Sequence, residues 1–165
     1  MAILSANKQR PKRLPAGGLT FRELALTGYT NHAGGSTNNE IFHGSMVVSD
    51  VSDADGYFRA VPLTSSTNMA SGDIFGGVAI DHALADSTQT ADGAVSVSVA
   101  VTGVFGFAVG SLAVTDIGAP AYASDDDTIG TSSTNTLWVG TIVAVDSTNV
   151  WVDISHAAGR TNTAT

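Results

Sequence analysis

The sequence contains no cysteine among its 165 residues. Disulfide bonds, thiolate zinc sites and cysteine nucleophiles are therefore excluded. Charged residues are also scarce, at 13% of the chain, whereas 43% of the residues are hydrophobic. Surface helices would carry many more charged side chains, so this composition favours short strands joined by turns.

Long apolar runs are missing as well. No stretch approaches the ~20 apolar residues that a membrane helix needs. The first four residues are too few for the apolar region of a signal peptide. We therefore expect neither membrane insertion nor secretion by the general pathway. The length fits one domain, which can bury roughly 70% of its unfolded surface without cross-links.

Charge is unevenly distributed along the chain. The net charge is −8, yet no acidic residue precedes Glu23. From Leu14 onward there are three basic and fifteen acidic residues, a net charge of −12. An acidic body repels nucleic acid, so we expect no nucleic-acid partner. The other four basic residues share one short segment: Lys8, Arg10, Lys12 and Arg13.

This basic segment lies in an extended arm, residues 1–18, in which Pro11, Pro15 and two glycines prevent a helix. One interpretation is a disordered terminus without a role. The other is a docking element that binds an acidic protein surface and orders on binding. We favour docking, because the acidic body would oppose a contact with nucleic acid.

Apolar and turn residues alternate along the body and predict about nine short strands. The clearest is 95–101, where valines at every second position share one face. A pair of glycines, Gly76 and Gly77, predicts a bulge or a close backbone approach within its strand. Only 111–117 is expected to form a helical turn. The strands are expected at 19–26, 41–50, 57–63, 74–80, 95–101, 104–109, 119–123, 137–145 and 149–154.

Short strands at regular spacing predict an all-β fold, a small β-barrel or β-sandwich of jelly-roll or tulip-like form. We expect three parts along the chain. They are the extended basic N-terminal arm 1–18, a single β domain 19–156 and a polar C-terminal tail 157–165.

The search for catalytic chemistry assigns no residue. Asp125, Asp126 and Asp127 form the densest acidic run, which we interpret as a solvated turn, with a calcium site as the alternative. The four histidines lack the close spacing of a metal site. Neither a G-x-S-x-G elbow nor a P-loop motif is present. We therefore expect no enzyme, no cofactor and no metal.

The two tryptophans occupy the last two predicted strands. We expect Trp138 in the core, as is usual for aromatic residues in strands. Trp151 alternates with Val150, Val152 and Ile154. If those three face the core, Trp151 lies outside it, where it would fill a contact between subunits.

Several segments, taken in order, resemble the small cement (decoration) proteins that tailed phages encode beside the major capsid gene. The resemblance covers residues 40–155. It does not include the arm or the loop 28–39. It rests on turn and strand residues and on their order and spacing. The segments are 43–48 with 55–57, then 75–79, 103–105, 116–126, and 140–146 leading to 150–154.

The resemblance implies a β-barrel or β-sandwich subunit on the outer surface of an expanded head, made in the host cytoplasm. Its partners would be the major capsid protein, whose neighbouring subunits it cements, and itself, with a homotrimer favoured over a homodimer. The residues expected to carry these protein contacts are Lys8, Arg10, Lys12, Arg13 and Trp151.

Two other functions remain open. One is a surface β-domain that binds carbohydrate or a host receptor through the loop 28–39, Trp151 or the acidic turn. The other is an enzyme on a β-barrel scaffold. A deep pocket lined by two or more of the four histidines would support the enzyme.

Overall fold

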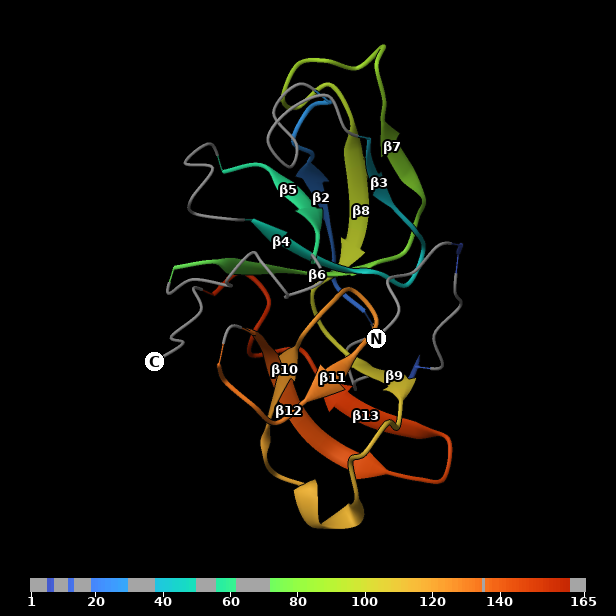
Figure 1. The fold of residues 1–165 in the computed structure, drawn as a ribbon, viewed down its shortest axis with the longest axis vertical. Coiled ribbons are helices and arrows are strands. Elements are labelled where there is room, and N and C mark those ends of the chain that lie inside the picture. Colours follow the sequence, from blue (N-terminus) through green and yellow to red (C-terminus); the bar gives the residue numbers. More distant parts are fainter. Residues whose placement is uncertain are drawn as a thin grey trace.

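The computed structural model describes residues 6–7, 12–13 (main chain only), 19–29, 38–49, 56–61, 72–134 and 136–160. Across these residues the fold is nearly all β, with thirteen strands in three sheets and a single short 3₁₀ turn (Figure 1). The all-β prediction is confirmed. The sheets are open and packed against each other, so the sandwich is the correct alternative and the closed barrel is not.

The largest sheet has six strands, and each neighbouring pair is antiparallel. Its last two long strands form a hairpin, as the sequence predicts. In spatial order the strands are β1 (Lys12–Arg13), β9 (Val104–Ala108), β13 (Asn149–Asp153), β12 (Leu137–Val145), β10 (Pro120–Ala123) and β11 (Ile129–Gly130).

The second sheet has five antiparallel strands, and the third has two. The five-stranded sheet contains β2 (Phe21–Ala25), β8 (Ser96–Ala100), β6 (Ile74–Ala79), β4 (Met46–Ser49) and β5 (Phe58–Ala60) in spatial order. The two-stranded sheet pairs β3 (Asn39–Ile41) with β7 (Ala83–Ala85). The 3₁₀ turn η3 (Val114–Asp116) lies within the helical turn expected at 111–117.

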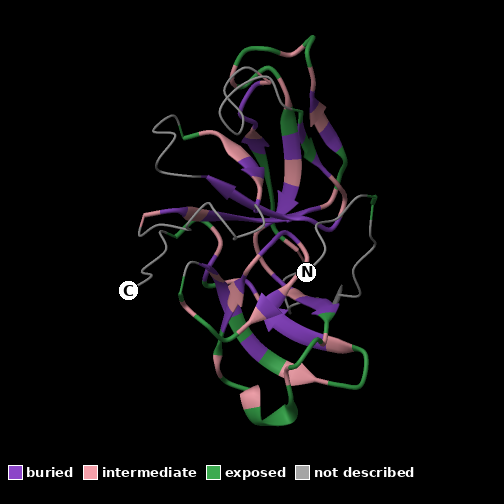
Figure 2. Ribbon diagram, viewed as in Figure 1, coloured by how far each residue is buried: buried purple, intermediate pink, exposed green. Residues whose placement is uncertain are grey.

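The five-stranded sheet separates two hydrophobic clusters. Met46 and Val48 of β4 pack into the larger cluster, which the six-stranded sheet lines on its other side. Val47, between them, packs into the smaller cluster together with residues of β3 and β7. Both faces of β4 and β6 are therefore covered, and both strands are almost continuously buried (Figure 2). A strand covered on two faces needs an apolar run instead of alternation, which explains the sequence of β4.

The glycine pair in β6 forms the predicted bulge and close approach. Val47 pairs with Gly77 and Val48 with Phe75, so Gly76 is an extra residue in the ladder. Gly77 has φ +134°, and a Cβ added there would lie 2.4 Å from the carbonyl oxygen of Ala100 on β8. Only glycine fits both constraints.

The arm contacts its own body at two described points. Lys12 and Arg13 pair with Phe105 and Val104 of β9 and so add a strand to the edge of the six-stranded sheet. Asn7 accepts a hydrogen bond on its side-chain oxygen from the backbone N–H of His43, at 2.8 Å. Lys8 and Arg10 lie outside the described residues.

The expected start of the polar tail at residue 157 is wrong. Ala157 is fully buried in the larger cluster. The backbone N–H of Gly159 donates to the carbonyl oxygen of Phe75, at 2.7 Å. These contacts, together with the hydrogen bond from the N–H of Arg160 to the carbonyl oxygen of Ala157, extend the packed body to Arg160.

Candidate interaction surfaces

Trp151 is not the exposed aromatic residue that the sequence predicted. As expected, Val150, Val152 and Ile154 face the larger cluster, whereas Trp151 lies on the opposite face of β13 and is not part of that cluster. However, Trp151 is only 9% exposed, and its indole N–H donates to the Asp146 carboxylate at 2.7 Å. Its neighbour on β9 is Gly106, which has no side chain to compete for space on that face. Trp151 is thus unsuited to a subunit contact.

Trp138, expected in the core, packs against the larger cluster but also lines a hollow at the surface. It is half-buried on β12, and its cross-strand partner on β10 is the half-buried Tyr122. The indole N–H of Trp138 donates to the carbonyl oxygen of Gly140 at 2.9 Å, which fixes the ring. The open hollow has a volume of about 330 Å³. Its lining residues are Gly118, Pro120, Tyr122, Trp138 and Thr141, none of them charged.

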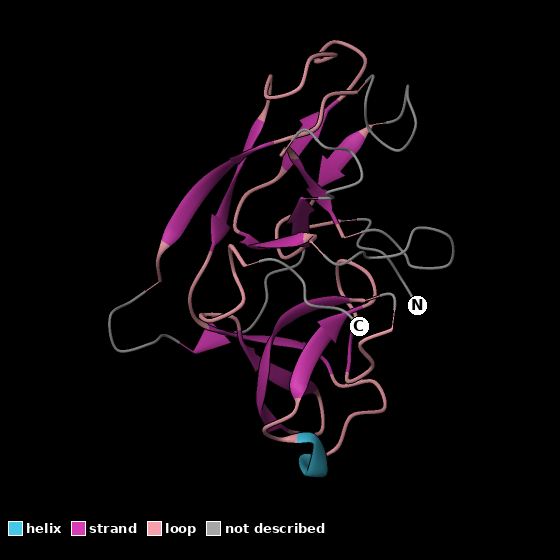
Figure 3. Ribbon diagram, turned by 90° about the vertical axis from the view of Figure 1, so that its left-hand side faces the viewer, coloured by secondary structure: helices cyan, strands magenta, loops and turns pink. Residues whose placement is uncertain are grey.

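A protruding turn lies directly beside the hollow. This turn knob, residues 114–117, contains η3 and extends below the six-stranded sheet (Figure 3). Val114 is 66% exposed and Ile117 49% exposed. The Asp116 carboxylate closes the turn by accepting the backbone N–H of Ala113 at 2.8 Å.

The turn knob is anchored to β12. The N–H of Gly118 donates to the carbonyl oxygen of Ile142 at 2.8 Å, and the N–H of Ile142 donates to that of Ala119 at 3.0 Å. Val143, the next residue on β12, is 41% exposed. Val114, Ile117 and Val143 are exposed apolar residues on segments that also carry lining residues of the hollow or lie next to them in sequence, and we call these residues together with the hollow the sheet-end patch. Sequence reasoning missed it, although Pro120 and Tyr122 alternate with small alanines on β10.

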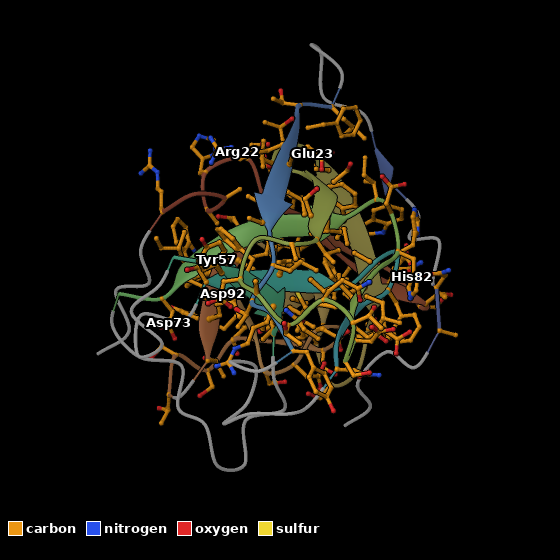
Figure 4. The ribbon with its side chains drawn as sticks, turned by 90° about the horizontal axis from the view of Figure 1, so that it is seen from above. Arg22, Glu23, Tyr57, Asp73, His82 and Asp92 are labelled. Atoms are coloured by element: carbon orange, nitrogen blue, oxygen red, sulfur yellow. The ribbon has the colours of Figure 1, made fainter. Side chains whose placement is uncertain are left out.

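A second exposed surface follows the start of the chain. β1 pairs with Val104 and Phe105, and β2 pairs with the adjoining strand β8. Both are end strands of their sheets. Phe21 is 54% exposed, and Arg22 and Glu23 beside it on β2 are exposed as well (Figure 4). We call β1 and residues 21–23 the N-terminal edge.

The acidic run is not a solvated turn, because two of its carboxylates are buried. Asp125 is fully buried and accepts the backbone N–H groups of Asp127 and Thr128, at 2.8 and 2.6 Å. Asp126 is 1% exposed and accepts the hydroxyl of Ser45 at 2.7 Å. The run therefore shapes the β10–β11 connection and fastens it to the start of β4.

Among the described histidines, His82 has an acidic and an aromatic neighbour. His82 lies 3.0 Å from a carboxylate oxygen of Glu40 and stacks obliquely on Phe42, with the ring centres 5.4 Å apart. It lies apart from Tyr57 and Asp92 when the molecule is seen from above (Figure 4). No histidine lines the hollow. In the part of the chain that the structure describes, no three His, Asp or Glu side chains are grouped to hold a metal ion.

Most of the loop 28–39 lies outside the described residues, but both of its ends are tied to the body. The backbone N–H of Gly28 donates to the Asp92 carboxylate at 2.7 Å. The side-chain amide of Asn39 donates to the carbonyl oxygens of Thr27 and Phe58, both at 3.0 Å.

No protein-family model, curated protein or solved structure matches the chain. No helix in the described ranges has the length and apolar character to span a membrane. The sheet-end patch and the N-terminal edge are thus the structural features that bear on what the protein binds.

Proposed function

We propose that this protein is a structural virion protein. It would bind the outside of an expanded phage head and cement neighbouring major capsid subunits. The observation that carries the proposal is the N-terminal edge, where Phe21 and Arg22 are both exposed on the end strand β2 and the main chain of the basic pair Lys12–Arg13 forms the end strand β1 of another sheet. The sequence resemblance to cement proteins supplies the partner.

The charge distribution supports attachment through this edge. Five of the seven basic residues lie at or before Arg22, whereas the first acidic residue is Glu23. A basic edge steers the protein toward an acidic coat surface and orients it there. Phe21 would then supply an apolar anchor, of the kind that dominates binding energy when it enters a pocket.

The backbone of the edge offers a second kind of contact. β1 and β2 end their sheets, and no described strand pairs with the outer side of β1 or of residues 21–25; directly after β2, Leu26 forms a bridge with Phe58 of β5. Such a side can accept an extended segment of a partner by main-chain hydrogen bonding. A subunit that touches two coat proteins gains from effective concentration, because the second contact is intramolecular. This is how individually modest contacts would reinforce a head.

A surface β-domain that binds carbohydrate is the second candidate. The hollow between Tyr122 and Trp138 is the observation that favours it, because aromatic faces can stack on the C–H face of a neutral sugar ring. Binding of a soluble saccharide by the isolated protein, without binding to heads, would favour this candidate.

Co-sedimentation with expanded heads that lack the protein, taken from the phage that encodes it, tests the cement role. We expect saturable binding at a fixed ratio to coat protein, and heads that then survive heating or chelation better. Replacing both Phe21→Ser and Arg22→Glu should weaken binding. Ser147→Glu adds a negative charge at an exposed turn residue outside both candidate surfaces and serves as the control. Absence of wild-type binding contradicts the proposal.

A further inference from the structure

Two arginines from opposite ends of the chain lie close together beside the start of β2. Of the three basic residues in the acidic body, Arg59 is buried, whereas Arg22 and Arg160 are exposed. The guanidinium of Arg22 lies over Gly159, because a Cβ added to Gly159 would be 3.6 Å from Nη1 of Arg22. Arg160 is the next residue, and neighbouring Cα atoms are about 3.8 Å apart. Both long side chains can therefore reach the same small ligand.

Neither guanidinium is neutralised by the described part of the chain. No hydrogen bond or ion pair joins either of them to another described residue. Glu23, the next residue after Arg22 on β2, instead accepts the hydroxyl of Ser98 on β8. Seen from above, Arg22 also lies apart from Asp73 and Asp92 (Figure 4). Two positive charges held near each other repel, and an anion bound between them removes that repulsion.

We infer that Arg22 and Arg160 form one carboxylate-binding site, and that its ligand is an acidic side chain of a protein partner. Arginine suits this role, because its planar guanidinium can donate two parallel N–H groups to the two oxygens of one carboxylate. The inference rests on the proposed function, since it names the chemical group of the coat subunit that the N-terminal edge would bind. It also adds to that edge a residue from the other end of the chain.

The backbone on both sides of the site is firmly held. β2 is paired with β8 over its whole length. The N–H of Gly159 donates to the carbonyl oxygen of Phe75 at 2.7 Å, and the N–H of Arg160 donates to that of Ala157 at 3.0 Å. Ala157 is itself fully buried in the larger cluster. Binding therefore needs to order only the two side chains, which limits its entropic cost.

Charge favours a single carboxylate over nucleic acid as the ligand. The net charge of −8 repels a long polyanion, whose many phosphates would meet the acidic surface around the site. The two arginines are a local exception of the size of one acidic side chain. A partner segment with one aspartate or glutamate can place its carboxylate there and keep the rest of its surface neutral.

An NMR titration of the whole chain tests the site. The probe is a short peptide with blocked ends and a single glutamate. The side-chain Nε–H signals of Arg22 and Arg160 should shift together, with one common dissociation constant that rises with added salt. Arg22→Gln and Arg160→Gln should each weaken binding about three- to fivefold. Ser147→Glu makes the same change in net charge at an exposed turn residue and should leave binding unchanged.

The same peptide with glutamine in place of glutamate is the sharpest comparison. It lacks the charged group, so wild-type chain should bind it more weakly, and neither arginine variant should change its affinity further. A variant with a disturbed fold would instead lose affinity for both peptides alike. The two peptides therefore separate loss of the carboxylate site from loss of structure.

Equal binding of the two peptides by the wild-type chain overturns the inference, as do arginine variants that bind the glutamate peptide unchanged. A phosphoserine peptide that binds more than tenfold more tightly than the glutamate peptide would overturn the assignment to a carboxylate. Co-sedimentation with heads is measured separately. Heads that bind the Arg160→Gln chain as tightly as wild type would overturn the assignment to the coat protein. A wild-type chain that binds the glutamate peptide but not heads would support the site and refute only the cement role.

Discussion

Replacing Gly77 by alanine should destabilise the protein by about 3 kcal/mol. With φ at +134°, Gly77 adopts a conformation that costs an L residue roughly 1–2 kcal/mol. The new Cβ would also lie 2.4 Å from the Ala100 carbonyl oxygen, whereas real Cβ contacts are essentially never shorter than 3.0 Å. β6 and β8 would have to separate by roughly 0.6 Å. This weakens the pairing of Val78 with Ala100, at about 1 kcal/mol per hydrogen bond.

Thermal unfolding followed by tryptophan fluorescence measures this loss. In a chain of this length about 3 kcal/mol corresponds to a fall in Tm of roughly 6–12 °C. Gly130→Ala on β11 is the matched control, because its φ is not in the left-handed region and no atom lies within 4 Å of the added Cβ. It should change stability by less than about 1 kcal/mol. Equal melting temperatures for the two variants would refute the argument.

Three further predictions concern the arm, the buried carboxylates and pH. Deleting residues 1–14 should reduce binding to heads in the co-sedimentation assay, and unchanged binding would rule the arm out as a docking element. Ser45→Ala should lower the free energy of unfolding by about 1.5–3 kcal/mol in chemical denaturation, because Asp126 loses a buried hydrogen bond to its carboxylate. The backbone N–H and the hydroxyl of Thr88 lower the pKa of Asp86, so this contribution to stability is present above the ordinary aspartate pKa. It is lost as pH falls through the lowered value. Thr88→Ala should raise the pKa of Asp86 in an NMR titration, and an unchanged value would contradict the assignment.

Local pattern was sufficient for most of the strands. The bounds of β12, Leu137–Val145, are those expected, and β13 ends one residue earlier than expected. In β8, Val97 and Val99 are buried, as their spacing predicts. The glycine pair in β6 was interpreted correctly because its constraint is a property of the backbone itself.

The burial of polar and aromatic residues could not be predicted in this way. Asp126 is buried together with its hydrogen-bond partner Ser45. Because Ser45 lies 81 residues away in the sequence, local pattern could not predict this burial. Trp151 is buried although it was expected to be exposed, and Trp138 is only half-buried, because burial depends on the neighbouring strand. Gly106 leaves room beside Trp151, whereas Tyr122 lies opposite Trp138.

Very short strands were also missed. β7 and β11 have three and two residues, too few for an alternating pattern to be recognised. Among the described strands, β11 pairs only with β10, and β7 only with β3. Strands this short form because a partner strand is available to pair with them, so they can be assigned only when the fold is known.

The covering of β4 and β6 on both faces has a consequence for unfolding. Removing either strand would strip one wall from both hydrophobic clusters at once. The two halves of the molecule therefore cannot melt in separate steps, and we expect a single cooperative transition. In the head-cementing role that we propose, strain applied at one end of the molecule would be opposed by the packing of both clusters.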